Sequence, residues 1–116
     1  IENSRTHDTR KIKTKKTKID VSDSTMEIVK QGMGECVNYG SCGMLKALSF
    51  DSGGKTGTAQ WNNNNDQNHA WFTGFAPYKN PKIVITVLVE EGEGGAKTAQ
   101  PVAYEFLKWW GNKYLK

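Results

Sequence analysis

The order of apolar and polar residues first predicts a helix between residues 22 and 38. Apolar residues recur there at spacings of three or four, which places them on one helical face. They are Met26, Val29, Met33, Cys36 and Val37. Ser22 precedes them and is a preferred N-cap residue, because its hydroxyl can accept a hydrogen bond from a free N–H group of the first turn. We expect the helix to end near Asn38, with Gly40 as a left-handed stop.

Two glycines, Gly32 and Gly34, fall inside this helix, and each lowers helix propensity by about 1 kcal/mol relative to alanine. Their presence predicts that another part of the chain packs closely there. Residues 41–54 follow as an expected loop, in which the apolar residues are Met44, Leu45, Leu48 and Phe50.

Three strands are predicted next, over residues 54–61, 69–76 and 82–90. The connections between them are short and polar, so they permit antiparallel hairpins and not parallel crossovers. The third strand is apolar on both faces from Ile83 to Val89, which is typical of a central strand covered by helices on both sides.

The last predicted element is a helix that follows a turn at Gly92, Gly94 and Gly95. Thr98 is its expected N-cap, and Pro101 fits the first turn, where no N–H donor is needed. Its apolar stripe comprises Ala99, Val102, Ala103, Phe106, Leu107, Trp110 and Tyr114, which we interpret as core. The fold class is therefore α+β, an antiparallel sheet packed with two helices.

The charge of the chain is concentrated at its start. The formal net charge is +4, and residues 1–20 carry all of it, with seven Lys and Arg against three Asp and Glu. Lysines are mixed with β-branched residues over 11–19, which predicts an exposed basic edge strand; a phosphate- or surface-binding arm is the alternative. We therefore divide the chain into a basic segment, 1–20, and the remaining domain, 21–116.

Several classes of protein are excluded or disfavoured by this composition. The neutral body lacks the basic face expected of a nucleic-acid-binding domain. The tryptophans, Trp61, Trp71, Trp109 and Trp110, are expected in the core or a cleft wall and not on a basic groove. No apolar run approaches the ~20 residues that span a bilayer. Because the sequence does not begin with Met, we expect a fragment of a longer protein.

The sequence contains no recognisable metal-binding motif and only two cysteines. Residues 62–66 lack the glycine of a calcium loop, and His7 and His69 have no partner at ligand spacing, so neither a metal nor another cofactor is expected. Cys36 and Cys42 have five residues between them. Whether they form a disulfide depends on a Cα separation that the sequence does not define, and we expect two unrelated thiols.

The densest candidate site is the run Lys55, Thr56, Gly57 and Thr58. It is not a nucleotide-binding loop, because Ser49 stands where that motif requires glycine. On a strand, the two threonines share a face and their hydroxyls can converge on one anion. Gly57 allows a ligand to approach the backbone, and Lys55 contributes positive potential from the other face.

This run resembles the Lys-Thr-Gly-Thr motif of serine transpeptidases and β-lactamases. Residues 69–77, 81–90 and 99–103 follow at the spacing of that family. From about residue 21 to residue 110, the chain resembles the C-terminal part of the transpeptidase domain of class B penicillin-binding proteins, of the penicillin-binding protein 2 type. The resemblance implies a fragment of the serine transpeptidase and β-lactamase-like fold.

The resemblance also implies roles for the four residues. Lys55 would line the cleft. Thr56 and Thr58, with Gly57 between them, would bind the terminal carboxylate of a peptidoglycan stem peptide or of a β-lactam. The backbone N–H of Thr58 would be an oxyanion-hole donor. The parent protein would be a D,D-transpeptidase of the bacterial cell envelope, on the extracytoplasmic side of the inner membrane.

Two further family motifs, Ser-x-x-Lys with the nucleophile and Ser-x-Asn, are not found. Ser52 and Lys55 match the first by letters alone, since the two glycines between them resist helix. Residues 78–80 mimic the other, but Pro77 and Pro81 indicate a turn. The chain alone is therefore not expected to catalyse. A further departure is the run 40–43, Gly-Ser-Cys-Gly, where the family usually carries Gly-Thr-Ala.

Two alternatives remain open at this level. One is a fragment of a β-lactamase or β-lactam sensor, which shares the motif, although residues 71–77 and the long apolar strand favour the transpeptidase. The other is a non-catalytic interaction module that uses the basic arm. The strand at 83–89 is also expected to have an unpaired edge in this chain, which would pair either with a second copy, giving a homodimer, or with the basic segment 11–19.

Overall fold

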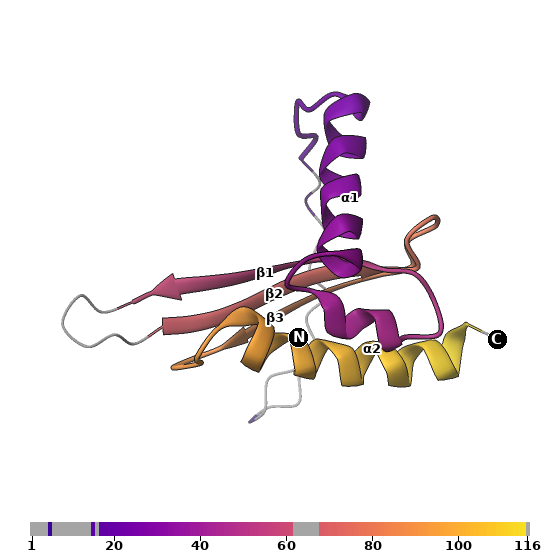
Figure 1. Ribbon diagram of the computed structural model, residues 1–116. Coiled ribbons are helices and arrows are strands. Elements are labelled where there is room, and N and C mark those ends of the chain that lie inside the picture. Colours follow the sequence, from indigo (N-terminus) through magenta and orange to yellow (C-terminus); the bar gives the residue numbers. More distant parts are fainter. Residues whose placement is uncertain (1–4, 6–14, 16, 62–67, 116) are drawn as a thin grey trace.

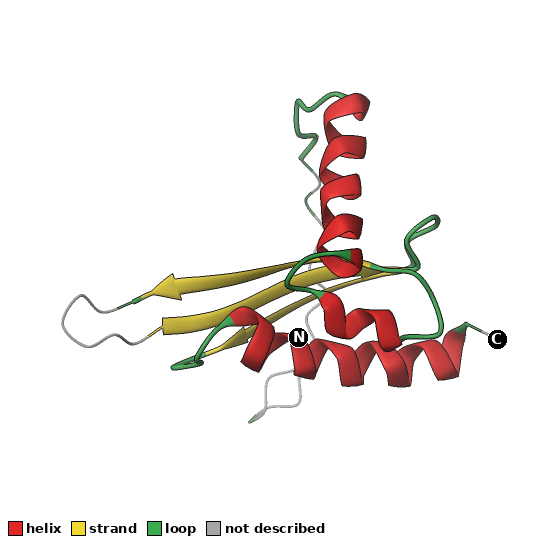
Figure 2. Cartoon of the chain, in the orientation of Figure 1, coloured by secondary structure: helices red, strands yellow, loops and turns green. Residues whose placement is uncertain are grey.

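The computed structural model describes residues 5, 15, 17–61 and 68–115. A three-stranded antiparallel sheet forms its centre, the long helix α2 runs along one face of this sheet, and α1 stands away from one end of it (Figure 1). Helices and strands are thus segregated as in an α+β fold, which confirms the predicted class (Figure 2). The elements are α1 (Asp23–Asn38), the short η1 (Gly43–Ala47), β1 (Gly53–Gln60), β2 (Asn68–Ala76), β3 (Ile83–Val89), η2 (Gly95–Ala99) and α2 (Gln100–Tyr114).

Helix α1 begins as predicted, since the Ser22 hydroxyl accepts a hydrogen bond from the N–H of Thr25 at 3.2 Å. It also ends at Asn38 as predicted, but Gly40 is not a left-handed stop, because none of the described glycines has a positive φ. Its apolar stripe is also largely exposed, including Met26 and Val29, and only Val37 of the stripe is buried. The first turns of α1 have no other helix or strand beside them, so only the C-terminal part of its apolar face is packed against the described residues (Figure 1).

The two glycines of α1 have different surroundings. A Cβ atom on Gly34 would lie 2.8 Å from Cε2 of Tyr78, so the predicted close packing is confirmed there. Around Gly32 there is nothing within 4 Å, and the prediction is wrong for that residue. The helix is therefore closely packed only near its C-terminal end.

The sheet is the predicted antiparallel meander in the order β1-β2-β3, with strand ends within one residue of those expected. Phe72 lies opposite Thr56 of β1 and Val87 of β3. Directly paired residues point to the same face. The face that contains Phe72 and Ala70 is the core face, where both are fully buried. It packs with Leu45, Ala99, Ala103 and Leu107, all of which are buried.

Among the described residues, strand β3 has the unpaired edge that was expected in this chain, but it lacks the cover on both faces that its composition suggested. In the described part of the sheet it pairs only with β2, and Val84 is 72% and Leu88 43% exposed. Helix α2 covers one face of the sheet, so only alternate residues of β3 pack against the core. These are Ile83, Ile85, Val87 and Val89.

The basic strand expected at 11–19 is not found where it can be checked. Residues 17–19 and Lys15 are described and belong to no strand. The other residues of this prediction lie outside the described part of the chain.

The approach to α2 also differs from the prediction. Thr98 is not an N-cap, because its N–H donates to the Gly94 carbonyl at 2.9 Å within the π-helical turn η2. Pro101 does occupy the first turn of α2. The predicted stripe is only partly core: Ala103 and Leu107 are fully buried, whereas Phe106 is exposed.

The tryptophans are mostly not core residues. Trp61, Trp71 and Trp109 are exposed, and Trp110 alone of the four packs partly buried against the core. No helix in the described ranges is long and apolar enough to cross a membrane.

Candidate functional site

The four motif residues lie on β1, an outer strand of the described sheet. The register places Thr56 opposite Phe72 and Thr58 opposite Ala70, so both threonines are on the core face of the sheet. Lys55 lies on the other face. The predicted separation of the lysine from the two threonines is confirmed.

Although the Lys55 side chain starts on the opposite face, its Nζ reaches the backbone of Thr56 at the outer edge of β1. Lys55 Nζ donates a hydrogen bond to the Thr56 carbonyl at 2.5 Å, so this carbonyl is open to a side chain at the edge. Backbone groups of alternate residues on a strand point to the same side. The N–H of Thr58 therefore faces outward with the Thr56 carbonyl. This N–H therefore points away from β2.

The backbone N–H and C=O of Gly57, between the two threonines, are directed toward β2. The backbone of η2 packs against this residue. A Cβ atom on Gly95 would lie 2.8 Å from the nitrogen and 2.7 Å from the oxygen of Gly57, and in contact with the Trp71 carbonyl. The backbone of η2 can approach the strand pair this closely only because residue 95 has no side chain. The neighbouring Gly94 would place a Cβ 3.5 Å from Thr58 Oγ1. The sequence indicated a flexible turn here, and it did not indicate that the turn borders the site.

A residue that the sequence did not suggest, Ser41, contacts the motif directly. Its Oγ lies 2.7 Å from Oγ1 of Thr56, and it comes from the segment between α1 and η1. The contact joins residues 15 positions apart, so no periodicity could reveal it. The only signal was that the run 40–43 departs from the family pattern.

The segment that carries Ser41 is closed by a disulfide between Cys36 and Cys42. The expectation of two unrelated thiols is therefore wrong. The chain turns back at the end of α1, and the N–H groups of Gly40 and Cys42 both donate to the Cys36 carbonyl, at 3.1 and 2.9 Å. This turn brings the two Cα atoms to 5.1 Å, within the range that a disulfide requires.

The structure supports the rejection of both motif look-alikes. Ser52 lies in the non-helical segment before β1 and is buried, so it does not begin a helix with Lys55 one turn later. Residues 78–80 belong to the connection between β2 and β3. Neither look-alike adds a nucleophile to the site.

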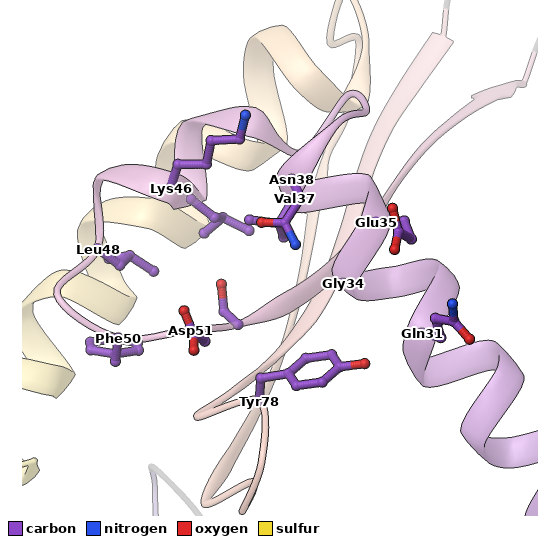
Figure 3. Close-up of a pocket in the computed structure, with 12 residues that line it drawn as sticks. Gln31, Gly34, Glu35, Val37, Asn38, Lys46, Leu48, Phe50, Asp51 and Tyr78 are labelled. Atoms are coloured by element: carbon purple, nitrogen blue, oxygen red, sulfur yellow. The ribbon is translucent and has the colours of Figure 1, made fainter.

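A separate cavity of about 350 Å³ lies between α1, η1 and the connection after β2 (Figure 3). Glu35, Asn38 and Lys46 line it, together with Asp51 and Tyr78. None of residues 55–58 is among its lining residues. The open edge of β1 and this cavity are therefore different places on the molecule.

The described ranges contain no group of three or more His, Cys, Asp or Glu residues that could hold a metal ion. His69 instead stacks on Trp61, with ring centroids 5.6 Å apart, and its Nδ1 accepts a hydrogen bond from the N–H of Glu91. The chemistry that this site can perform is recognition of an anion by hydroxyl and N–H donors.

Comparison with known proteins agrees with the resemblance noted in the sequence. The chain matches the family model of the penicillin binding protein transpeptidase domain over residues 1–108. It is 36% identical over 105 residues to the peptidoglycan D,D-transpeptidase MrdA of Haemophilus influenzae, which covers 77% of this chain and 16% of MrdA. It is also 36% identical over 96 residues to a probable peptidoglycan D,D-transpeptidase, PenA of Neisseria flavescens, covering 75% of this chain and 24% of PenA.

Solved structures agree with the sequence matches. Pseudomonas aeruginosa PBP2, in complex with WCK 5153, superposes with a TM-score of 0.70 at 34% identity, over 81% of this chain and 21% of that chain. The D,D-transpeptidase domain of a peptidoglycan glycosyltransferase from Eggerthella lenta gives 0.69 at 33% identity, over 83% and 22%. The chain thus spans less than a quarter of the length of each of these relatives. The match over residues 1–108 shows that the chain belongs to the penicillin-binding protein transpeptidase domain family.

Proposed function

We propose that this chain provides the substrate-binding strand of a peptidoglycan D,D-transpeptidase. The observation that carries the proposal is the outer edge of β1, where two threonine hydroxyls share one face and the Thr58 N–H points outward. A carboxylate accepts hydrogen bonds from several donors at once, and such charge-assisted bonds are stronger than neutral ones.

Each motif residue then has a distinct role. The hydroxyls of Thr56 and Thr58 bind the terminal carboxylate of the stem peptide that donates the acyl group, or the equivalent carboxylate of a β-lactam. The Thr58 N–H is one of the donors to the oxyanion that forms when the carbonyl is attacked. Gly57 has no side chain, so a ligand can lie against the strand backbone. Lys55 contributes positive potential at the edge of the cleft.

The reaction of the longer protein is acyl transfer through a covalent intermediate. A serine that this chain does not contain attacks the penultimate D-Ala carbonyl, expels the terminal D-Ala and forms an acyl-enzyme. An amine of a second stem peptide then takes the acyl group. A preorganised N–H aimed at the developing oxyanion contributes about 2.7–4 kcal/mol in comparable enzymes.

The organisation and surroundings of the longer protein are part of the same proposal. We divide the chain into a basic segment, residues 1–20, and the C-terminal portion of the transpeptidase domain, 21–116, although the family match itself begins at residue 1. The protein acts on the extracytoplasmic side of the inner membrane of a bacterium, where its substrate lies. The Helicobacter pylori PBP2 structure was determined in complex with MreC, and we propose an assembly partner of that kind here. The open edge of β3 also permits a homodimer.

The test is intact-mass analysis after incubation with a labelled penicillin. The longer protein that contains this chain is expected to form one acyl adduct, on a serine outside residues 1–116. The isolated chain is expected to form none, because it lacks the nucleophile. An adduct on Ser52 of the isolated chain would contradict the assignment, as would a longer protein that is never acylated.

A further inference from the structure

The segment that carries Ser41 is held in place from several sides. The disulfide ties Cys42, which is fully buried, to Cys36 of α1. Both Gly40 and Cys42 donate to the Cys36 carbonyl, and a Cβ on Gly40 would lie only 3.0 Å from the Cα of Cys36. Residues 40–42 are therefore tightly folded against the end of α1. Ser41 has little freedom to move away from β1.

The position of Ser41 decides what the Thr56 hydroxyl can do. The two hydroxyl oxygens are 2.7 Å apart, and the Ser41 Oγ is 3.6 Å from Cys36 Sγ. A hydroxyl has one proton to donate and two lone pairs that accept. When Thr56 donates its proton to a carboxylate, the bond between the two hydroxyls must be donated by Ser41. This arrangement leaves the Thr56 proton directed toward the ligand.

We propose that Ser41, held by the Cys36–Cys42 disulfide, is a positioning residue that orients the Thr56 hydroxyl toward the substrate carboxylate. The inference rests on the proposed function, because it assumes that Thr56 binds this carboxylate. Ser41 acts through Thr56 and does not touch the ligand. The disulfide acts one step further away, by fixing the segment that presents Ser41.

The central experiment compares two probes on the longer protein that contains this chain. One probe is a penicillin with its free carboxylate, and the other is its methyl ester, which lacks the negative charge. Second-order acylation rates are measured for both by intact-mass analysis. A loss confined to the free acid reports on carboxylate binding. A general structural defect lowers both rates together.

Four variants separate the possible roles. Ser41→Ala removes the hydroxyl, and we expect the free-acid rate to fall about two- to twelve-fold, the value of one neutral hydrogen bond, with less than a two-fold change for the ester. Ser41→Thr keeps the hydroxyl and is expected to stay within two-fold of the unaltered protein. The double variant Cys36→Ala, Cys42→Ala keeps Ser41 but frees its segment, so an intermediate loss is expected. Ser49→Ala, at an exposed serine elsewhere, is the matched control and should change neither rate.

The outcomes distinguish this inference from the function on which it rests. If the unaltered protein is not acylated by the penicillin, the proposed function is overturned and the inference with it. If the protein is acylated and Ser41→Ala reacts normally with the free acid, only the inference is overturned. The same holds if Ser41→Ala slows both probes equally, because that is the result of a merely structural role. Thermal unfolding of each variant, followed by circular dichroism, verifies that the proteins compared are folded.

Discussion

The two faces of the sheet differ sharply, although the same three strands form both. On the core face, Phe72 and Ala70 are fully buried under α2. On the other face, Trp71, Val84 and Leu88 are exposed. The open face also carries apolar side chains, although Lys55, Thr73 and Thr86 lie on it as well, and Phe75 on the same face is buried. The difference lies in what covers the two faces, since α2 is the element of the described chain that lies along the sheet (Figure 1).

A similar contrast is found along α1, whose C-terminal end is packed and whose N-terminal end is exposed to solvent. We call these its closed end and its open end. Gly34 is against Tyr78 and Val37 is buried, whereas Met26 and Ile28 near the start are exposed. Contiguous exposed apolar patches mark surfaces that contact another protein segment. The chain spans only 16% of MrdA and 24% of PenA, so the relatives have many other residues that can cover the equivalent surfaces. We therefore expect other residues of a longer protein to cover the open face.

The largest expected effect comes from neighbouring residues on opposite faces of β2. Phe72→Ala should lower the free energy of unfolding by about 3–5 kcal/mol, because it leaves a cavity in the core. Trp71→Ala, one position away, should cost less, about 1–2 kcal/mol, because its side chain is 38% exposed. Urea denaturation of both variants provides the measurement. Equal losses would mean that the two faces are equally packed.

The next prediction tests whether the outer edge of β1 serves ligand binding and not the stability of the fold. In the longer protein, Thr58→Ala removes one hydrogen bond to a charged group, worth about 1.5–3 kcal/mol, so acylation by a penicillin should slow roughly 10- to 150-fold. Folding should be nearly unaffected, because Thr58 is exposed. Thr58→Ser retains the hydroxyl and serves as the control.

The backbone role of Thr58 can be separated from that of its side chain. Thr58→Pro removes the N–H and should cost more than Thr58→Ala, although damage to the strand contributes to the loss. Circular dichroism must therefore accompany the acylation rates. An unchanged rate in Thr58→Ala would remove this hydroxyl from the site.

Much of this comparison could be foreseen from the sequence, because it depends on local chemistry. The period of two placed Thr56 and Thr58 on one face, and the Ser22 hydroxyl capped α1 as expected. The meander followed from the short polar connections. Each of these inferences uses only residues close together in the chain.

The errors arose where burial or contact depends on distant residues. The apolar run of β3 was interpreted as covered on both faces, but apolar composition cannot reveal whether the covering element is part of the same chain. The disulfide depended on a Cα separation set by the turn after α1. The contact between Ser41 and Thr56 depended on that same turn. Sequence periodicity carries no information about any of these.

A smaller effect is expected at the two glycines of α1, which test its closed and open ends. Gly32→Ala should stabilise the protein by about 0.5–1 kcal/mol, because alanine is the better helix former and nothing lies within 4 Å. Gly34→Ala should instead destabilise it by about 1–3 kcal/mol, because the new methyl group meets the Tyr78 ring. Thermal unfolding of the two variants measures the difference. A gain in both would show that Tyr78 moves aside easily.

The smallest effect on stability, and the most informative one about the open side, concerns the free edge of β3. Unpaired strand edges promote association, and lysines on an edge oppose it. Sedimentation analysis over a range of concentrations should show self-association that Val84→Lys reduces, while stability changes by only about 0.5 kcal/mol or less, because Val84 is exposed. Val102→Lys adds the same charge at an exposed position on α2 and should leave association unchanged. A protein that stays monomeric at every concentration would show that this edge does not pair between copies.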